Sequence, residues 1–171
     1  TVVSERAGGT DDDVCGEVAA ARLAALDASA FQSCLDLCLE HLLASVCGAV
    51  ALHNALSALL TSRVDPSVLI KNEPQALSEI EDDDLVRNSR DGVGELCEGV
   101  LKRVGRLVQL RKEQNARLKQ SELRRVWASS LSFASAIERA TGEPAFALRS
   151  ALVAQARAFL EKRHSDAKAA L

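Results

Sequence analysis

The chain has 171 residues, of which 47% are hydrophobic, 3% are aromatic and three are prolines, and its formal net charge is −3. This length and hydrophobic content suffice for one globular domain and exclude a wholly disordered chain. Ala and Leu dominate and Glu and Arg are abundant, as they are in helices that pack side by side, so the composition predicts an all-α protein. We expect long antiparallel helices that form a bundle or a rod-like segment.

The cysteines do not favour a disulfide framework, because their number is odd and the chain has neither a secretory signal nor an N-x-[ST] sequon. They are Cys15, Cys34, Cys38, Cys47 and Cys97. A reducing compartment is therefore expected. The chain contains no methionine, not even at its first position, and we expect it to be a segment of a longer protein.

The first residues include "AGG" and "TDDD", which predict a flexible lead-in over residues 1–13. Residues 14–171 are expected to form one helical domain or a segment of a larger helical protein. Negative charge is stabilised at a helix N-terminus, so the aspartates favour a helix start near Val14. We expect this first helix to end or bend around residues 27–29.

A regular spacing of three or four residues between apolar side chains predicts one long helix over residues 31–60, about 45 Å in length. The stripe consists of Phe31, Leu35, Cys38, Leu42, Val46, Ala49, His53, Leu56 and Leu60. Six further apolar side chains lie off it: Leu37, Leu39, Leu43, Val50, Leu52 and Leu59. We therefore expect more than one neighbour to bury this helix. Four polar residues interrupt the run 42–60, which falls short of a membrane span.

Two prolines interrupt the helical pattern after this helix. Pro66, in "SRVDPS", and Pro74, in "NEPQ", lack an amide hydrogen and bias the preceding residue away from helix. Residues 73–84 then carry six acids and no base. The sequence predicts a loop with some local structure over residues 63–84.

A second long helix is expected from about Leu85 towards Lys119. Its seam is Val93, Cys97, Val100, Val104 and Leu107, with spacings of four, three, four and three. Four glycines, at positions 92, 94, 99 and 105, weaken this helix by roughly 1 kcal/mol each relative to Ala. It therefore needs tertiary packing, and the missing side chains would let another helix approach closely.

The helical period continues through Leu123, Val126, Trp127, Leu131, Ala134 and Ile137 to "TGEP". There Gly142 suits a helix C-terminal cap and Pro144 suits the first turn of the next helix, so two antiparallel neighbours are expected. The final helix carries a core-facing stripe of Leu148, Leu152, Phe159 and Leu160. We expect Gln155 to hydrogen-bond to a neighbouring helix and His164, in the last turn, to complement the helix dipole.

One group of side chains has the residue types of a metal site. Cys34, Cys38 and His41 lie at i, i+4 and i+7 on one helix, and thiolates with imidazole bind zinc. Burial in an ordinary core is the stronger interpretation, because cysteine is among the most buried residue types. No nucleophile or dinucleotide motif is complete, so neither an enzyme nor a cofactor is expected.

The segment 102–125 carries nine bases and two acids. A solvated helix face is the first interpretation, and an acidic protein partner or an anionic membrane is the second. Only Trp127 lies nearby as a stacking ring, so nucleic acid is not expected to be a partner.

Residues 118–171 resemble the Vps54 family, a subunit of the Golgi-associated retrograde protein (GARP) vesicle-tethering complex. The resemblance rests on "SEL" at Ser121, on Phe133, Glu138 and Gly142, and on "LRSALVAQARAFLEKRH" followed by Lys168 and Leu171. The sequence departs from the family at Glu143-Pro144 and in the acidic run with its glycine-rich sequel. The endosomal subunit syndetin is similar at a greater distance.

This resemblance implies a non-catalytic subunit segment that acts in endosome-to-Golgi retrograde transport, at trans-Golgi network and endosomal membranes. It implies that other tethering-complex subunits are the partners, that SNARE proteins and small GTPases contact other parts of the chain, and that membrane association is peripheral or indirect. A self-contained helical adaptor and a Cys/His metal-binding domain are the alternatives. The residues expected to pack in the core or against partners are Phe31, Leu35, Leu42, Val46, Leu56, Val100, Val104, Leu107, Leu148, Leu152 and Phe159.

Overall fold

The computed structural model of the chain describes residue 18 and residues 20–63 and 75–170, and every regular element in these ranges is a helix. The helices are α2 (Ala28–Arg63), α3 (Gln75–Leu110), α4 (Lys112–Ala116), α5 (Gln120–Thr141) and α6 (Phe146–Ala169). Residues 20–25 form a further helical stretch ahead of α2. The prediction of an all-α protein is confirmed. The lead-in expected over residues 1–13 lies outside the described residues.

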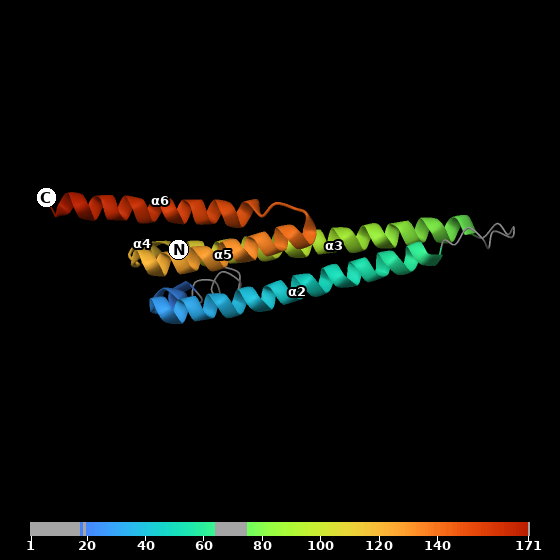
Figure 1. Cartoon of the computed structure of the whole chain (residues 1–171), viewed down its shortest axis with the longest axis horizontal. Coiled ribbons are helices and arrows are strands. Elements are labelled where there is room, and N and C mark those ends of the chain that lie inside the picture. Colours follow the sequence, from blue (N-terminus) through green and yellow to red (C-terminus); the bar gives the residue numbers. More distant parts are fainter. Residues whose placement is uncertain (1–17, 19, 64–74, 171) are drawn as a thin grey trace, which may run out of the picture.

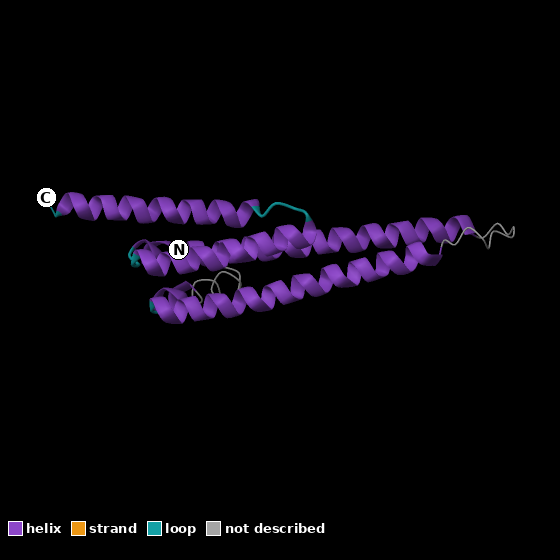
Figure 2. Ribbon diagram, in the orientation of Figure 1, coloured by secondary structure: helices purple, strands orange, loops and turns teal. Residues whose placement is uncertain are grey.

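The long helices α2 and α3 run antiparallel, and α5 and α6 cover only part of their length (Figures 1 and 2). Helix α5 packs on α2, and α6 packs on α3 and α4. Among the described side chains, the last fully buried one along α2 is Val46 and the first along α3 is Cys97. We use these positions to divide the molecule into a bundle, which contains α2 up to Val46, α3 from Cys97, and α4 to α6, and an arm, which contains the remaining parts of α2 and α3.

The start of α2 follows from a side-chain cap. The backbone N–H of Ala30 donates to the Asp27 carboxylate at 2.7 Å, which satisfies an amide that the first turn of a helix leaves without a partner. The helical stretch 20–25 ends just before this cap, where the sequence predicts a bend.

The prediction for α3 is wrong at both ends. The helix begins at Gln75, so residues 75–84 are helical and the predicted loop is shorter than expected; residues 64–74 lie outside the described part. Pro74 stands directly before the first helical residue in the sequence, and the first turn carries no acid, so the acids from Glu79 onwards lie beyond the turn in which the helix dipole acts. The helix ends at Leu110, and α4 makes the corner that leads to α5.

The turn between α5 and α6 matches the expectation for Gly142, which has a φ of 75° and donates its N–H to the Glu138 carbonyl at 2.8 Å. The expectation for Pro144 is wrong, because α6 begins two residues later, at Phe146. The Glu138 carboxylate accepts the N–H of Ala145 at 2.9 Å and takes the place of a local cap.

Ten of the eleven residues expected to pack in the core or against partners belong to the core cluster or pack against it, and Leu56 lies outside it. Fully buried are Phe31, Leu35, Val46, Val100, Val104, Leu148 and Leu152, and half-buried are Leu42, Leu56, Leu107 and Phe159. Gln155 is buried and donates to the Lys112 carbonyl at 3.1 Å, as expected. Leu160 is 64% exposed, contrary to its predicted place in the core stripe, although it lies beside the first turns of α5. His164 lies more than a turn before the helix end at Ala169, and not in the last turn as expected.

Candidate protein-interaction site

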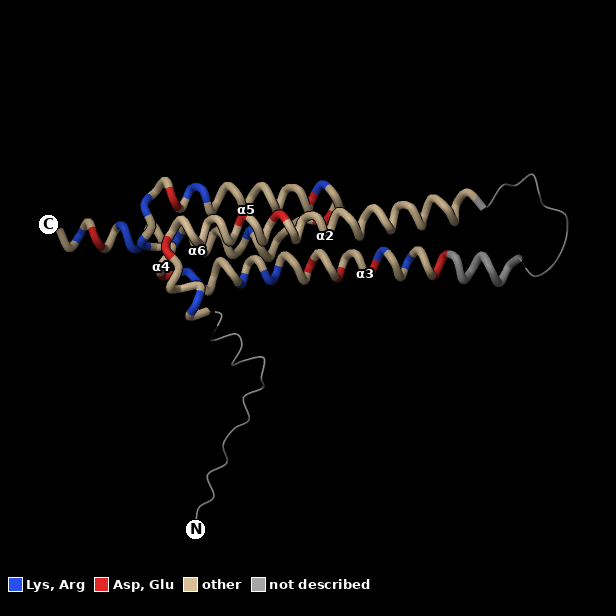
Figure 3. Tube along the Cα trace, turned by 90° about the horizontal axis from the view of Figure 1, so that it is seen from below, with Lys and Arg blue, Asp and Glu red and all other residues tan. Residues whose placement is uncertain are grey.

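The outer side of α2 exposes several large apolar side chains. Leu52 and Leu59 are 74% and 64% exposed, and Leu37 is also exposed. No Asp, Glu, Lys or Arg occurs between His41 and Arg63, so residues 47–62 of the arm portion of α2 carry none of these charged side chains (Figure 3). Both α3 and α5 pack on α2, as expected, but these three leucines stay exposed, contrary to the prediction. Leu52 and Leu59 lie in the arm, along which α5 does not reach (Figure 1), whereas Leu37 is exposed within the bundle.

The hydropathy of α2 makes this exposure unusual. The most apolar 18-residue window of the helix has a mean hydropathy of 1.7, yet only 17% of that window is buried. By length and composition the helix Ala28–Ser62 also meets the requirements for crossing a membrane, a test that the core helix of a soluble protein also meets. Here the helix packs against α3 and α5 on one side and leaves an apolar face open.

The two helices of the arm contact one another through half-buried side chains. His53 Nδ1 and Ser89 Oγ lie 3.2 Å apart, within hydrogen-bonding distance, and Val50 and Val93 pack beside the core cluster. Two helices can cover one side of each other only, so the remaining sides of the arm stay open.

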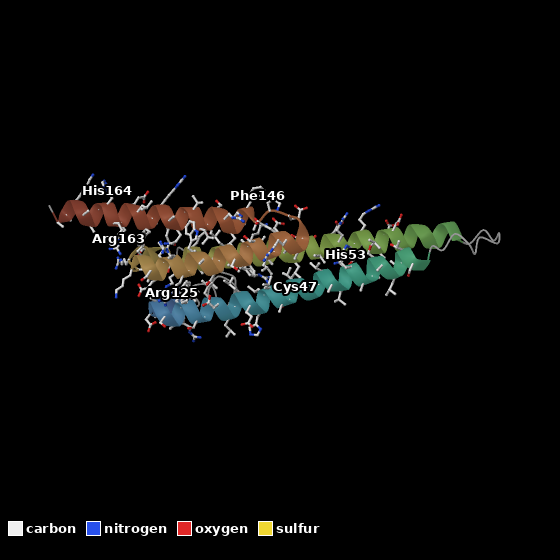
Figure 4. All side chains as sticks on the ribbon, viewed as in Figure 1. Cys47, His53, Arg125, Phe146, Arg163 and His164 are labelled. Atoms are coloured by element: carbon white, nitrogen blue, oxygen red, sulfur yellow. The ribbon has the colours of Figure 1, made fainter. Side chains whose placement is uncertain are left out.

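A groove of about 1050 Å³ lies where the bundle meets the arm. Its walls come from the middle of α2, from α3 and from the turn between α5 and α6. Apolar lining residues include Val50, Val93, Leu101 and Ile137, and charged ones are Arg90, Asp91, Glu95, Glu98 and Glu143. Phe146 stands at the lip with 74% of its surface exposed, and Figure 4 shows it at the start of α6. The groove therefore combines apolar lining with a mainly acidic wall.

An ion pair holds the lip of the groove in place. Arg149 Nε and Nη2 donate to the two carboxylate oxygens of Glu138 at 2.8 and 2.6 Å, and the same carboxylate accepts the Ala145 N–H. Hydrogen bonds from Arg149 and from the Ala145 backbone lower the pKa of Glu138 to about 2. This bidentate pair links α5 to α6 across the turn and thereby positions Phe146 and Glu143.

The cysteines and histidine considered for a metal site do not form a complete ligand set. Cys34 and Cys38 are half-buried on α2, and His41 is exposed. Burial raises the pKa of the Cys38 thiol, and Cys34 raises it further, which disfavours the thiolate that a metal requires. Within the described residues, no group of three or more His, Cys, Asp and Glu side chains is placed to hold a metal ion. The metal-binding alternative stays a prediction.

The basic segment is mostly solvent-exposed, with one exception. Its exposed bases are Lys102, Arg103, Arg106, Lys112, Arg117, Lys119, Arg124 and Arg125. Arg111 is 2% exposed, and its guanidinium donates to the carbonyls of Leu23 and Leu26 and lies 4.5 Å from the centre of the Phe31 ring. Burial lowers the pKa of Arg111, while the charge of Asp27 acts in the opposite direction. One of the nine bases, Arg111, is therefore a buried structural residue, a clamp that links the α3–α4 corner to the segment before α2 by hydrogen bonds.

Sequence reasoning missed Arg111, Phe146 and the groove. A signal existed for Arg111, which stands four residues after Leu107 and continues the seam of α3. No local pattern distinguishes Phe146 or the acidic wall, because both acquire their setting from the end of α5.

The fold and these surfaces define an all-helical protein with a bundle, an uncharged exposed helix face and an acid-walled groove. No known family model, characterised protein or solved structure matches the chain.

Proposed function

We propose that this chain is a non-catalytic interaction segment whose open α2 face packs against helices of partner subunits. The observation that carries this proposal is the exposure of the most apolar part of the chain, with Leu52 and Leu59 in water and no charge between His41 and Arg63. An exposed apolar surface of this kind marks an interaction site more often than an inert one. A helix-lined surface is best covered by further helices.

The assembly that we propose is a vesicle-tethering complex of endosome-to-Golgi transport, and its support is the resemblance of residues 118–171 to the Vps54 family. Several residues that carry this resemblance have structural roles: Phe133 is buried, Glu138 binds Arg149, and Gly142 caps α5. These residues therefore hold the α5–α6 hairpin of this chain together. Other subunits are the proposed partners, with peripheral placement at trans-Golgi network and endosomal membranes.

The test is affinity purification of the full-length protein, with quantification of co-purifying subunits. A double variant, Leu52→Glu with Leu59→Glu, places two charges on the α2 face. Burying each leucine is worth about 1.5–3 kcal/mol, so we expect at least about a ten-fold loss of the partner subunits. Leu160→Glu is the matched control, because Leu160 is equally exposed but lies on α6. Full recovery of the partners by the double variant contradicts the proposal.

A second candidate is membrane association through the same α2 face, which its mean hydropathy of 1.7 favours. Flotation of the purified 171-residue chain with neutral phosphatidylcholine vesicles separates the two. Flotation that the double variant abolishes supports the membrane, whereas flotation at background level, together with subunit loss in the purification, supports protein partners. Co-purifying subunits of another kind would instead support the self-contained adaptor.

A further inference from the structure

The groove between the bundle and the arm is an incomplete helix-packing site. Helix α5 ends at Thr141 and the chain turns into α6, so none of the described helices covers the surface of the arm beyond this point (Figures 1 and 4). The groove is lined by α2, α3 and the α5–α6 turn. A helix that docked there would contact several neighbouring elements, as a helix does inside a bundle.

The lining suits the apolar side of a helix. Val50 of α2 and Val93 of α3 line the groove and are half-buried, and Ile137 of α5 lines it as a fully buried side chain. Gly94 also lines the groove, and a Cβ added there would meet nothing within 4 Å. Gly105, in contrast, already lies against α6, with Ala151 Cβ 3.5 Å from its added Cβ. A glycine on α3 thus lets α6 approach closely in the bundle, and Gly94 leaves comparable room for a helix in the groove.

The volume of the groove matches a segment of helix. A helix about 10–12 Å across, inserted to half its diameter, fills about 1050 Å³ over about four turns. Phe146, exposed at the lip, offers an aromatic anchor of the type that dominates protein interfaces.

The charges select the kind of helix. Four acids and one base line the groove, and one of the acids, Glu98, also pairs with Lys102 at 2.6 Å. The α3 portion of the arm, residues 75–96, carries seven acids and two bases in the sequence. This field repels phosphate and attracts basic side chains, which argues for a protein helix and against nucleic acid or an anionic membrane.

We propose that this groove docks an amphipathic helix of a partner protein, with apolar side chains towards α2 and α3 and Lys or Arg along both edges. The inference rests on the proposed helix-packing function and adds the chemistry of one partner. It concerns a surface separate from the outer leucines of α2.

The probe is a fluorescein-labelled peptide of about 20 residues with Leu at heptad positions a and d and Lys at e and g; its matched control has Glu at e and g. Fluorescence anisotropy measures its binding to the 171-residue chain at physiological salt. We expect saturable binding of the Lys peptide and at least about ten-fold weaker binding of the Glu peptide. Absence of saturable binding of the Lys peptide overturns the inference.

Two glycine variants locate the binding. Gly94→Trp fills the groove and should weaken binding of the Lys peptide at least about ten-fold. Gly92→Trp is the matched control, because Gly92 is also in open space on α3 but does not line the groove. Binding of the Lys peptide to this variant should stay within about two-fold of wild type. Circular dichroism checks that both variants keep their helix content. Equal binding by both variants places the peptide elsewhere and rejects the groove.

A charge variant and its control exclude non-specific attraction. Glu95→Lys changes the groove wall, whereas Glu40→Lys makes the same change on an exposed part of α2 in the bundle. If the peptide docks in the groove, Glu95→Lys alone should weaken its binding, and equal weakening by both variants overturns docking in the groove.

If the Lys peptide fails to bind while Leu52→Glu with Leu59→Glu still removes the subunits from the full-length protein, the groove inference fails and the proposed function stands. If the Lys peptide binds the groove but the double variant keeps its subunits, the proposal for the α2 face fails and the groove inference stands.

Discussion

The bundle and the arm contain parts of the same two helices, yet among the described side chains those that are fully buried along them all lie in the bundle. In the bundle, α5 and α6 add cover to α2 and α3, so side chains such as Leu35 and Val108 lose nearly all contact with water. In the arm, α2 and α3 are each other's only neighbours within the described part of the chain, and Leu52 remains 74% exposed on the same helix as Leu35. Burial here depends on the number of neighbouring helices more than on local composition.

The largest expected effect is a difference between leucine truncations in the two regions. Leu148→Ala, in the bundle, removes a fully buried side chain and should lower the free energy of unfolding by about 2–5 kcal/mol. Leu56→Ala, in the arm, removes a half-buried one and should cost less than about 1.5 kcal/mol. Urea unfolding followed by circular dichroism measures both. Equal losses would show that the arm is as tightly packed as the bundle.

The buried arginine provides the next largest effect. Arg111→Ala leaves the carbonyls of Leu23 and Leu26 without their donor and should lower the free energy of unfolding by about 2–3 kcal/mol. Arg125→Ala, on the exposed side of α5, is the matched control and should change it by less than about 0.5 kcal/mol. Urea unfolding gives both values, and a neutral Arg111→Ala would contradict the clamp at the α3–α4 corner.

Glycine substitutions should have opposite signs in the two regions. Gly92→Ala, in the open space of the arm, should raise the free energy of unfolding by about 0.5–1 kcal/mol, because alanine favours helix. Gly142→Ala, in the α5–α6 turn, should lower it by about 1–2 kcal/mol, because its φ of 75° strains an L side chain. Thermal unfolding of the two variants checks the signs, and a stabilising Gly142→Ala would contradict the left-handed cap.

The smallest effect is a dependence on pH at the lip of the groove. The pKa of Glu138 is about 2 in the folded chain, below its ordinary value of 4.5, so its charge stabilises the fold above about pH 4.5 and this contribution is lost as the pH falls towards 2. Wild type should therefore be more stable than Glu138→Gln at neutral pH and equal to it near pH 2. Glu143→Gln, at an exposed position in the turn, is the control. Urea midpoints across this range measure the difference, and one that persists to pH 2 would contradict the ion pair.

Local patterns predict much of the helical structure. The spacing from Phe31 onwards predicts α2, and "TGEP" predicts the turn after α5, because periodicity and Gly142 act within a few residues. The break after Leu110 has no such signal. It contains neither glycine nor proline, and it accompanies the burial of Arg111 against carbonyls more than eighty positions away.

The candidate site was predictable only in part. Surplus apolar surface on α2 is visible in the sequence, but periodicity treats Leu52 and Leu39 alike, and the structure exposes one and buries the other. Likewise, the metal-type residues Cys34 and Cys38 have a recognisable spacing, whereas the acids around the groove come from separate elements. The spacing of side chains along α2 does not specify where the neighbouring helix α5 ends.

By itself, the sequence determined the helical class, the stripes of α2 and the Gly142 cap, because helix formation and capping depend on side chains within one or two turns. Tertiary structure alone decided that α5 ends beside the middle of α2, that Arg111 is buried, and that Phe146 and the acidic wall meet at one groove. The physical reason is that burial arises from contacts between distant segments. A single helix cannot determine which of its apolar faces another helix will cover.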